Sequence, residues 1–174
     1  MEIRALQPGD DRSSFRSGDG ALDRFFHQYA GQNQFRHHLG VTYVAVDAGR
    51  ILGFVTVAPR HLEIEDLPER ERKRLPRYPI PVLGLARLAV DETARGLGLG
   101  QQLLRFVLRL ALEMAERVGC AGVVVDAKPG AVDFYSRYGF TTFDVLEGES
   151  AARPRQTLMW LPIGAIKAAR DPSH

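Results

Sequence analysis

The sequence contains a single cysteine, Cys120, among its 174 residues. One thiol can form neither an intrachain disulfide nor a zinc site built from several cysteines, and this usage is typical of a reducing compartment. The sequence also has no uncharged apolar stretch near the roughly 20 residues that a membrane-spanning helix needs, and it starts without the apolar run of a signal peptide. We therefore expect a cytoplasmic protein that does not contact a membrane.

An excess of one charge is also missing, because 23 Lys and Arg residues against 21 Asp and Glu residues leave a net charge of +2. This balance excludes a polybasic protein and an acidic tail protein, so any nucleic-acid contact needs a local basic patch. The pair His37-His38 lacks the spacing and the carboxylate partners of a metal site, and we expect no metal. With 45% hydrophobic residues, we expect one globular domain at residues 1–162 and a C-terminal tail at residues 163–174.

The hydrophobic pattern predicts an α/β fold. Two β-branched runs joined by a short polar turn with Gly49 indicate a hairpin. Residues 100–117 carry the wide apolar face of an amphipathic helix, and a second helix is expected to begin near Pro129 and end at Gly139. The prolines and dense charge of residues 63–81 favour an exposed excursion with one helical turn. The expected strands, which give a mixed sheet of about six or seven strands, are residues 2–6, 41–46, 51–57, 82–90, 122–126, 140–145 and 157–161.

Residues 85–104 combine a strand, a short turn, a glycine-rich loop and the start of the long helix. Glycines let consecutive backbone N–H groups face a ligand, and the helix start adds partial positive charge, so this arrangement is typical of a phosphate site. The spacing fits neither the dinucleotide fingerprint nor the P-loop. It fits R-x-x-G-x-G through Arg95, Gly98 and Gly100, with Gly96 in addition. Alternatively, these glycines only form a tight strand-to-helix turn.

A second motif is Phe134-Tyr135-Ser-Arg-Tyr-Gly139-Phe140, which follows the buried strand. A phenol, with a pKa of about 10, holds its proton at neutral pH and can deliver it to a leaving group that becomes basic. On its own, a tyrosine beside a phenylalanine on an apolar helix face is more often part of the core. Cys120 is likewise expected to be a core residue rather than a nucleophile.

Together the two motifs resemble the acetyl-CoA motif of the GNAT superfamily of N-acetyltransferases, in which the second follows the first by about 35 residues. The resemblance implies acetyl-CoA as co-substrate and a sheet that splays where it binds. It implies that the β-strand backbone receives the acetyl carbonyl and pantetheine, that the loop holds the pyrophosphate, and that Tyr135 protonates the departing thiolate. The implied acetyl-CoA residues are Leu88, Ala89, Val90, Arg95, Gly96, Leu97, Gly98 and Gly100.

A narrower resemblance links the chain to the GNAT toxins of bacterial toxin–antitoxin pairs. It rests on Phe15-x-Ser17-Gly18 with Leu22-Asp23-x-Phe25, on Val82-x-Gly84-Leu85-x-Arg87-Leu88-Ala89-Val90-Asp91, and on Val125-Asp126-Ala127. Those enzymes acetylate the α-amine of aminoacyl-tRNA and are neutralised by a ribbon-helix-helix antitoxin. The resemblance therefore implies aminoacyl-tRNA as substrate and such an antitoxin as partner, and a homodimer is a further assembly that we consider.

The chemistry of this acceptor needs no strong base, because a peptide α-amine has a pKa of about 7.7 to 8.0. Glu63, Glu65 and Asp91 are base candidates by position only, and we expect each to be a solvated surface carboxylate. A tRNA substrate requires phosphate contacts. For the basic cluster of the 63–81 excursion the alternative is a solvated helical face, and for Arg87 it is a buried ion pair. The residues predicted to contact RNA are Arg36, Arg72, Lys73, Arg74, Arg77 and Arg87.

Two other functions stay open from the sequence. An acetyltransferase for a small amine or a protein amino terminus would share the acetyl-CoA motif and would act without RNA. A CoA-binding regulatory module without turnover would share the loop, although an intact Tyr135 argues against it.

Overall fold

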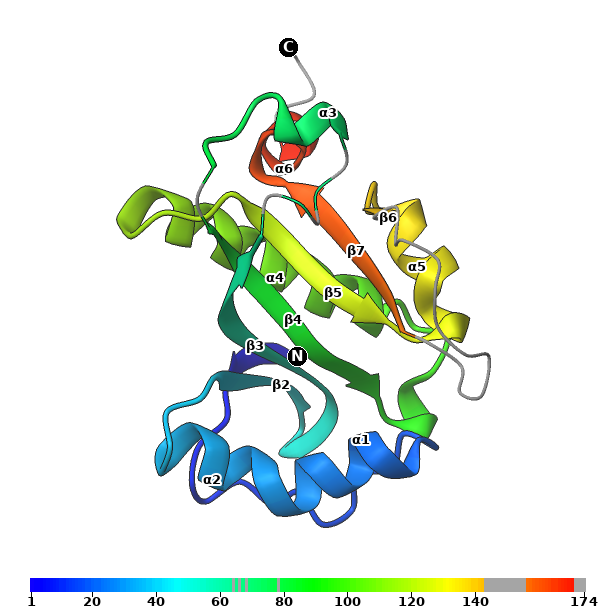
Figure 1. Ribbon diagram of the computed structural model, residues 1–174. Coiled ribbons are helices and arrows are strands. Elements are labelled where there is room, and N and C mark those ends of the chain that lie inside the picture. Colours follow the sequence, from blue (N-terminus) through cyan, green and yellow to red (C-terminus); the bar gives the residue numbers. More distant parts are fainter. Residues whose placement is uncertain (64, 66, 68, 78, 143–155, 171–174) are drawn as a thin grey trace, which may run out of the picture. The chain divides into compact units, whose positions relative to one another are not determined.

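The computed structural model describes the chain except residues 64, 66, 68, 78, 143–155 and 171–174. Within the described residues, seven strands form one mixed, open sheet in the order β1-β2-β3-β4-β5-β7-β6, flanked by helices (Figure 1). The expected α/β class is therefore confirmed. The strands are β1 (Glu2–Ala5), β2 (Val41–Asp47), β3 (Arg50–Leu62), β4 (Ile80–Val90), β5 (Gly122–Ala127), β6 (Thr141–Thr142) and β7 (Thr157–Pro162). The helices are α1 (Gly20–Arg24), η1 (Phe25–Tyr29), α2 (Ala30–Phe35), α3 (Glu69–Arg72), η3 (Glu92–Ala94), α4 (Leu99–Arg117), η4 (Pro129–Ala131), α5 (Val132–Arg137) and α6 (Ile163–Arg170).

The chain forms two compact units that both take residues from β3, β4 and α4. The first unit consists of Met1–Ala58 and Leu85–Arg109, and the second of Pro59–Gly84 and Leu110–His174. No helix in the described part of the chain is long and apolar enough to cross a membrane.

In the first unit, the predicted hairpin is present as β2 and β3. The two strands pair antiparallel with Val41 opposite Val57, and β1 pairs antiparallel with the other edge of β2. The turn places Gly49 at a φ of +77°, in the left-handed region that favours glycine. The short polar connection therefore does what its composition predicts.

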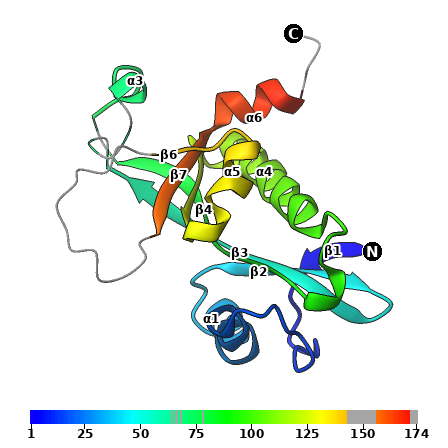
Figure 2. The ribbon, with the colours of Figure 1, turned by 90° about the vertical axis from the view of Figure 1, so that its right-hand side faces the viewer.

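One face of this hairpin carries the aromatic core of the first unit. Phe26 stacks on Phe54 of β3 with ring centroids 4.4 Å apart, and Phe15 meets both rings edge-on. Figure 2 shows α1 along this face of β2 and β3. Asp19 caps α1 by accepting hydrogen bonds from the backbone N–H groups of the first turn.

Tyr29 does not join this core, although a regular helical period places it on the same face as Phe25. The helix widens into the π-turn η1, and the side chain of Tyr29 is 44% exposed. A π-turn contains more residues than an α-turn, so residues after it rotate away from the expected stripe. Tyr29 therefore lies outside the apolar face that a regular helix through Phe25 would give it.

In the second unit, β7 pairs antiparallel with β5 and with β6, and Val124 lies opposite Trp160. These two residues pack with Val82, Ile80 and Leu62 in one buried cluster. Because Ile80 joins this cluster, β4 begins before the predicted position at residue 82. Of the strand predicted at residues 140–145, residues 140–142 lie in the described part of the chain; Thr141–Thr142 form β6, and Phe140 directly precedes it.

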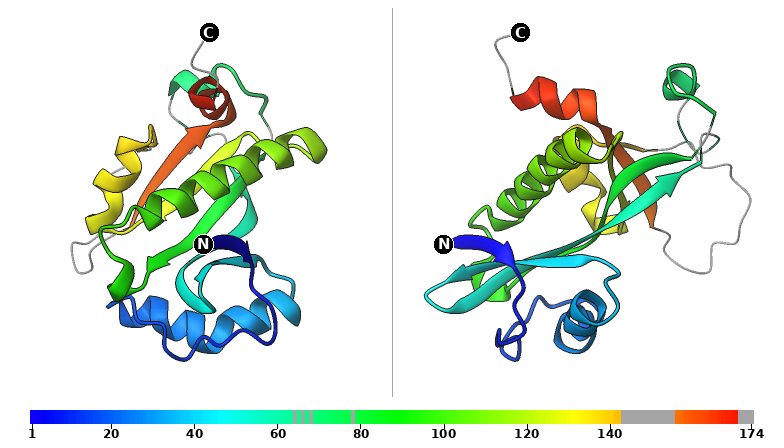
Figure 3. Two further views of the ribbon diagram at one scale, coloured as in Figure 1. Left: turned by 180° about the vertical axis from the view of Figure 1, so that it is seen from behind. Right: turned by 90° about the vertical axis from the view of Figure 1, so that its left-hand side faces the viewer.

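Two segments of this unit that the sequence predicts to be mostly irregular, residues 63–81 and residues 163–174, each contain a helix. The predicted helical turn of the 63–81 excursion is present as α3, which has no buried residue. Residues 163–174, for which the sequence predicts only a tail, contain α6, and Figure 3 shows it directly after β7. Ile166 of α6 is buried and provides its anchor.

Candidate functional site

The glycine loop between η3 and α4 has the open backbone that an anion site needs. Gly96 and Gly98 have φ values of +78° and +77°, a conformation that L side chains rarely adopt. Both residues are exposed, and a Cβ built on either would have no heavy atom within 4 Å. The 19-residue helix α4 begins directly afterwards, and its first-turn N–H groups have no partner within the helix. The loop therefore fits the pyrophosphate that the sequence predicts.

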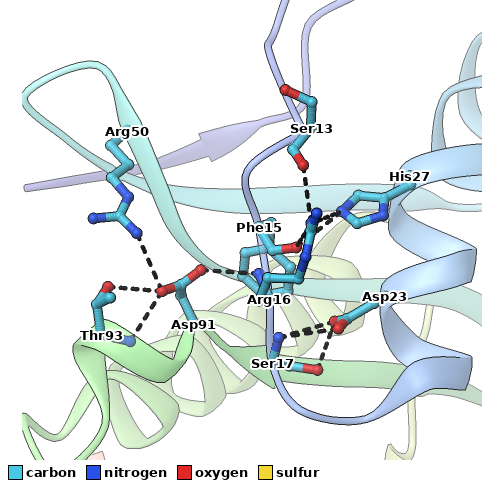
Figure 4. A network of polar contacts seen from close by, with 9 residues as sticks. All are labelled: Ser13, Phe15, Arg16, Ser17, Asp23, His27, Arg50, Asp91 and Thr93. Atoms are coloured by element: carbon cyan, nitrogen blue, oxygen red, sulfur yellow. Dashed lines mark hydrogen bonds and ion pairs between the residues drawn. The ribbon is translucent and has the colours of Figure 1, made fainter.

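Arg95, the first residue of the motif, is tied to the N-terminal segment of the chain. Its Nη2 donates a hydrogen bond to the carbonyl oxygen of Ser17. Ser17 is fixed in turn by Asp23, which accepts hydrogen bonds from its hydroxyl at 2.6 Å and its backbone N–H at 3.0 Å. The Ser17-Gly18 and Leu22-Asp23 cluster and the glycine motif are thus joined in one network, a link that neither motif reveals alone. Figure 4 shows the contacts between Ser17 and Asp23.

Asp91 organises the entrance to the same loop. Its carboxylate accepts hydrogen bonds from the Thr93 hydroxyl at 2.7 Å, from the Thr93 backbone N–H at 3.0 Å and from the Arg16 backbone N–H at 3.0 Å (Figure 4). The Arg50 guanidinium lies 3.4 Å away. Burial alone raises the pKa of Asp91, but these hydrogen bonds and Arg50 outweigh it and hold the pKa below its usual value.

The expectation that Asp91 is a solvated surface carboxylate is therefore wrong. The residue is 1% exposed, and two of its partners, Arg16 and Arg50, come from segments remote in sequence. A carboxylate with a lowered pKa is a poor proton acceptor, so Asp91 has a structural role and not that of a base. Glu63 and Glu65 are exposed, as expected.

Asp91→Ala is expected to lower the free energy of unfolding by about 1–3 kcal/mol, the usual range when buried donors lose their acceptor. Because the folded-state pKa is lowered, the carboxylate stabilises the fold above the unfolded-state pKa, and this contribution disappears as pH falls through the folded-state value. Urea unfolding at pH 7 and at successively lower pH measures both effects. The exposed Asp133 provides the control, and a loss of stability in Asp133→Ala equal to that in Asp91→Ala would contradict this role.

Tyr135 on α5 is a buried tyrosine with its proton firmly held. Its ring meets Phe134 and Phe140 edge-on, with centroids 5.1 Å and 5.4 Å away. Burial raises the pKa of its phenol to about 12. The hydroxyl has no hydrogen bond to any residue that the structure describes, and no enclosed side-chain oxygen there lacks a partner. Tyr135 as a whole is 5% exposed.

The β4 residues predicted to contact acetyl-CoA differ in burial: Ala89 is buried, whereas Leu88 and Val90 are half-buried. Arg87 next to them is also half-buried, with its Cζ 3.7 Å from the ring centroid of Phe25. Among the described residues no carboxylate pairs with Arg87, so the alternative of a buried ion pair has no partner in that part of the chain. The roles of these residues in binding stay predictions.

The basic residues of the 63–81 excursion are exposed: Arg72, Lys73, Arg74 and Arg77. Lys73 lies 3.7 Å from Glu69 across one helical turn, and both side chains are 75% exposed. Exposed pairs of this kind contribute little to stability, so the cluster is not needed for folding. Arg36 is exposed as well, at the end of α2 in the first unit. The structure thus places the predicted RNA-binding residues in both units.

Comparison with known proteins gives the same answer as the two motifs. The model of the acetyltransferase (GNAT) domain matches residues 38–142. The chain is 34% identical to a tRNA-acetylating toxin of Mycobacterium tuberculosis over 140 residues, which span 79% of this chain and 82% of that protein.

Solved structures share the fold over nearly the whole chain. AtaT complexed with acetyl-methionyl-tRNAfMet has a TM-score of 0.83 and 24% identity, covering 97% of this chain and 98% of that one. A mutant AtaT toxin bound to the C-terminus of the antitoxin AtaR and acetyl-CoA has a TM-score of 0.76 and 23% identity, covering 97% and 96%.

Proposed function

This chain belongs to the GNAT acetyltransferase family, and on this premise we propose that it is a toxin that transfers the acetyl group of acetyl-CoA to the α-amine of aminoacyl-tRNA. An acetylated α-amine cannot attack a peptidyl ester, so the product stops translation. The observation that carries the proposal is the likeness to a tRNA-acetylating toxin, with 34% identity over 79% of the chain.

Each part of the site has a task in this reaction. Acetyl-CoA supplies a thioester whose acetyl carbon is open to attack by an amine. The N–H groups of the glycine loop and of the first turn of α4 bind the pyrophosphate, which fixes the co-substrate along β4. The backbone of Leu88 and Val90 orients the acetyl carbonyl and stabilises the charge that develops on its oxygen.

The proton transfers need one acid from the protein. Roughly a tenth or more of a free α-amine with a pKa of 7.7 to 8.0 is neutral at pH 7, so the nucleophile exists without a base. As the new C–N bond forms and the C–S bond breaks, Tyr135 delivers its hydroxyl proton to the sulfur, and the amine releases its surplus proton to water. A phenol whose pKa is about 12 remains protonated until that moment.

We further propose that the chain acts in the cytoplasm, where charged tRNA is found, and that a ribbon-helix-helix antitoxin neutralises it. A homodimer would offer a second set of basic residues to the same tRNA. Size-exclusion chromatography with light scattering, on the chain alone and with the product of a neighbouring gene, tests both assemblies. A chain that remains monomeric and binds no such product would contradict them.

The substrate is tested by offering labelled acetyl-CoA together with charged tRNA, deacylated tRNA, a peptide and a polyamine in separate reactions. We expect label to enter charged tRNA only. Transfer to the peptide or polyamine but to no charged tRNA would favour the small-amine or N-terminal acetyltransferase instead. Binding of acetyl-CoA without transfer to any acceptor would favour a regulatory module.

The exposed basic cluster predicts a salt effect. Replacing Arg72, Lys73 and Arg74 together with alanine is expected to raise KM for charged tRNA. The slope of log KM against log[salt] should also fall by about 2 to 3, because each phosphate contact adds about 0.7 to 0.9 to that slope. The KM for acetyl-CoA should stay unchanged. The matched control is Arg105, Arg109 and Arg117 replaced with alanine, which removes the same charge from exposed positions of α4. Equal slopes for the two triple variants would contradict this contact.

A further inference from the structure

A cavity of about 120 Å³ lies in the first unit beside Arg87. Its walls come from η1, α2 and the adjoining parts of β2, β3 and β4. The polar residues on these walls are Asn33, Gln34, Thr42, Thr56 and Arg87.

Three of these polar side chains are already committed to the protein. Gln34 donates to the carbonyl oxygen of Leu6 at 3.1 Å and accepts from the backbone N–H of Thr42 at 2.9 Å. The hydroxyl groups of Thr42 and Thr56 bond each other at 2.7 Å. Among the described residues, the side chains of Asn33 and Arg87 have no hydrogen bond or ion pair, so they are the groups that the cavity offers to a ligand.

The orientation of Arg87 leaves its hydrogen-bonding edge available. Its guanidinium lies over the ring of Phe25 at 3.7 Å, which covers one flat face. The five N–H donors of a guanidinium lie in its plane, so stacking does not use them. A planar fork of this kind matches a carboxylate or a phosphate through two parallel hydrogen bonds.

Among the residues that line the cavity, the only charged side chain is the cation Arg87. Burial lowers the pKa of Arg87, and no carboxylate among the described residues compensates for it, although an arginine remains charged at neutral pH. Residues 24–46, which supply α2 and the start of β2, contain no Asp or Glu. A partly desolvated cation without a counter-ion is unfavourable, and an anion that enters the cavity relieves this.

We propose that Arg87 and Asn33 bind an anionic group of the acceptor substrate in this cavity. The inference rests on the proposed function, because Arg87 directly precedes Leu88, whose backbone is predicted to orient the acetyl carbonyl. Neighbouring Cα atoms are about 3.8 Å apart, so the anion is held close to the reacting amine. Aminoacyl-tRNA offers two such anions, the phosphodiester of its terminal nucleotide and, for acidic amino acids, the side-chain carboxylate.

The first test is Arg87→Gln, with Arg24→Gln as the matched control. Arg24 is exposed on α1 in the same unit, and both changes remove one positive charge. Arg87→Gln is expected to raise KM for charged tRNA about 10- to 100-fold, the equivalent of one hydrogen-bonded charge, with KM for acetyl-CoA unchanged. Arg87→Lys keeps the charge but loses the planar pair of N–H donors, so its KM for charged tRNA should lie between those of the wild type and Arg87→Gln.

Asn33→Asp gives an independent variant, because it places a carboxylate in the cavity and supplies Arg87 with the counter-ion that no described residue provides. It too should raise KM for charged tRNA. If both Arg87→Gln and Asn33→Asp fold and have the wild-type KM for charged tRNA, while the wild type is active, the anion site is overturned and the proposed function still stands. The source of the anion follows from two substrates: an equal loss with glycyl-tRNA and aspartyl-tRNA assigns the phosphodiester, and a loss with aspartyl-tRNA alone assigns the carboxylate.

Direct binding separates the cavity from the reaction. Inorganic phosphate and acetate are titrated by calorimetry into the chain saturated with CoA, so that the glycine loop is filled. We expect binding to wild type and to Arg24→Gln that is lost in Arg87→Gln. If no charged tRNA is acetylated but this pattern is found, the proposed function fails while the anion site stands. If neither anion binds the wild type, the anion site fails.

Discussion

Tyr135→Phe is expected to lower kcat by about 100-fold or more, the usual scale for loss of a general acid. The substitution removes only the hydroxyl, so the departing thiolate must take its proton from water. The ring contacts with Phe134 and Phe140 remain, and the hydroxyl has no hydrogen bond within the described residues to lose. Affinity for acetyl-CoA and the free energy of unfolding should therefore stay nearly the same.

Single-turnover acetylation of charged tRNA measures this effect, with calorimetry for acetyl-CoA affinity. The control is Tyr138→Phe, since Tyr138 follows the same helix and packs on Phe134 with centroids 5.2 Å apart. Because burial raises the pKa of Tyr135 to about 12, ionisation of this group should cause no fall in kcat between pH 7 and about pH 10. A near-normal kcat for Tyr135→Phe would assign the residue to packing.

Gly98→Val is expected to weaken acetyl-CoA binding by about 100-fold, the equivalent of two lost hydrogen bonds to a charged group. The added side chain would occupy open space in front of the loop, where the pyrophosphate is predicted to lie. The φ of +77° also makes valine strained there, so strain must be separated from blocked binding.

Gly49→Val provides that separation. Gly49 in the β2–β3 turn has the same φ of +77°, and a Cβ there also has no heavy atom within 4 Å. Both variants should lose comparable stability in urea unfolding, but only Gly98→Val should lose affinity for CoA by calorimetry. Equal CoA affinity in the two folded variants would contradict the assignment of the pyrophosphate to this loop.

Local patterns made much of this architecture predictable. The turn at Gly49, the apolar stripe of α4 and the glycine stop after α5 each depend on residues a few positions apart, so their signals lie in short windows of sequence. The glycine motif could be recognised for the same reason, because the positive φ at Gly98 and the helix start at Leu99 depend only on neighbouring residues.

The features that sequence reasoning missed depend on remote partners. Asp91 is buried because the backbone of Arg16, 75 positions earlier in the chain, donates to it. Arg87 stacks on Phe25, which no spacing rule connects to it. The π-turn that exposes Tyr29 and the anchoring of α6 by Ile166 likewise follow from tertiary packing, which overrides local propensity.

The central claim is that the acetyl group ends on the α-amine of the amino acid carried by tRNA. Its most direct test is the mass of the amino acid released by mild alkaline hydrolysis from charged tRNA after reaction with purified chain and acetyl-CoA. We predict an N-acetyl amino acid, absent from reactions with the Tyr135→Phe chain at matched short times. Unmodified amino acid, or acetyl groups found on the RNA or on protein side chains instead, would contradict the account.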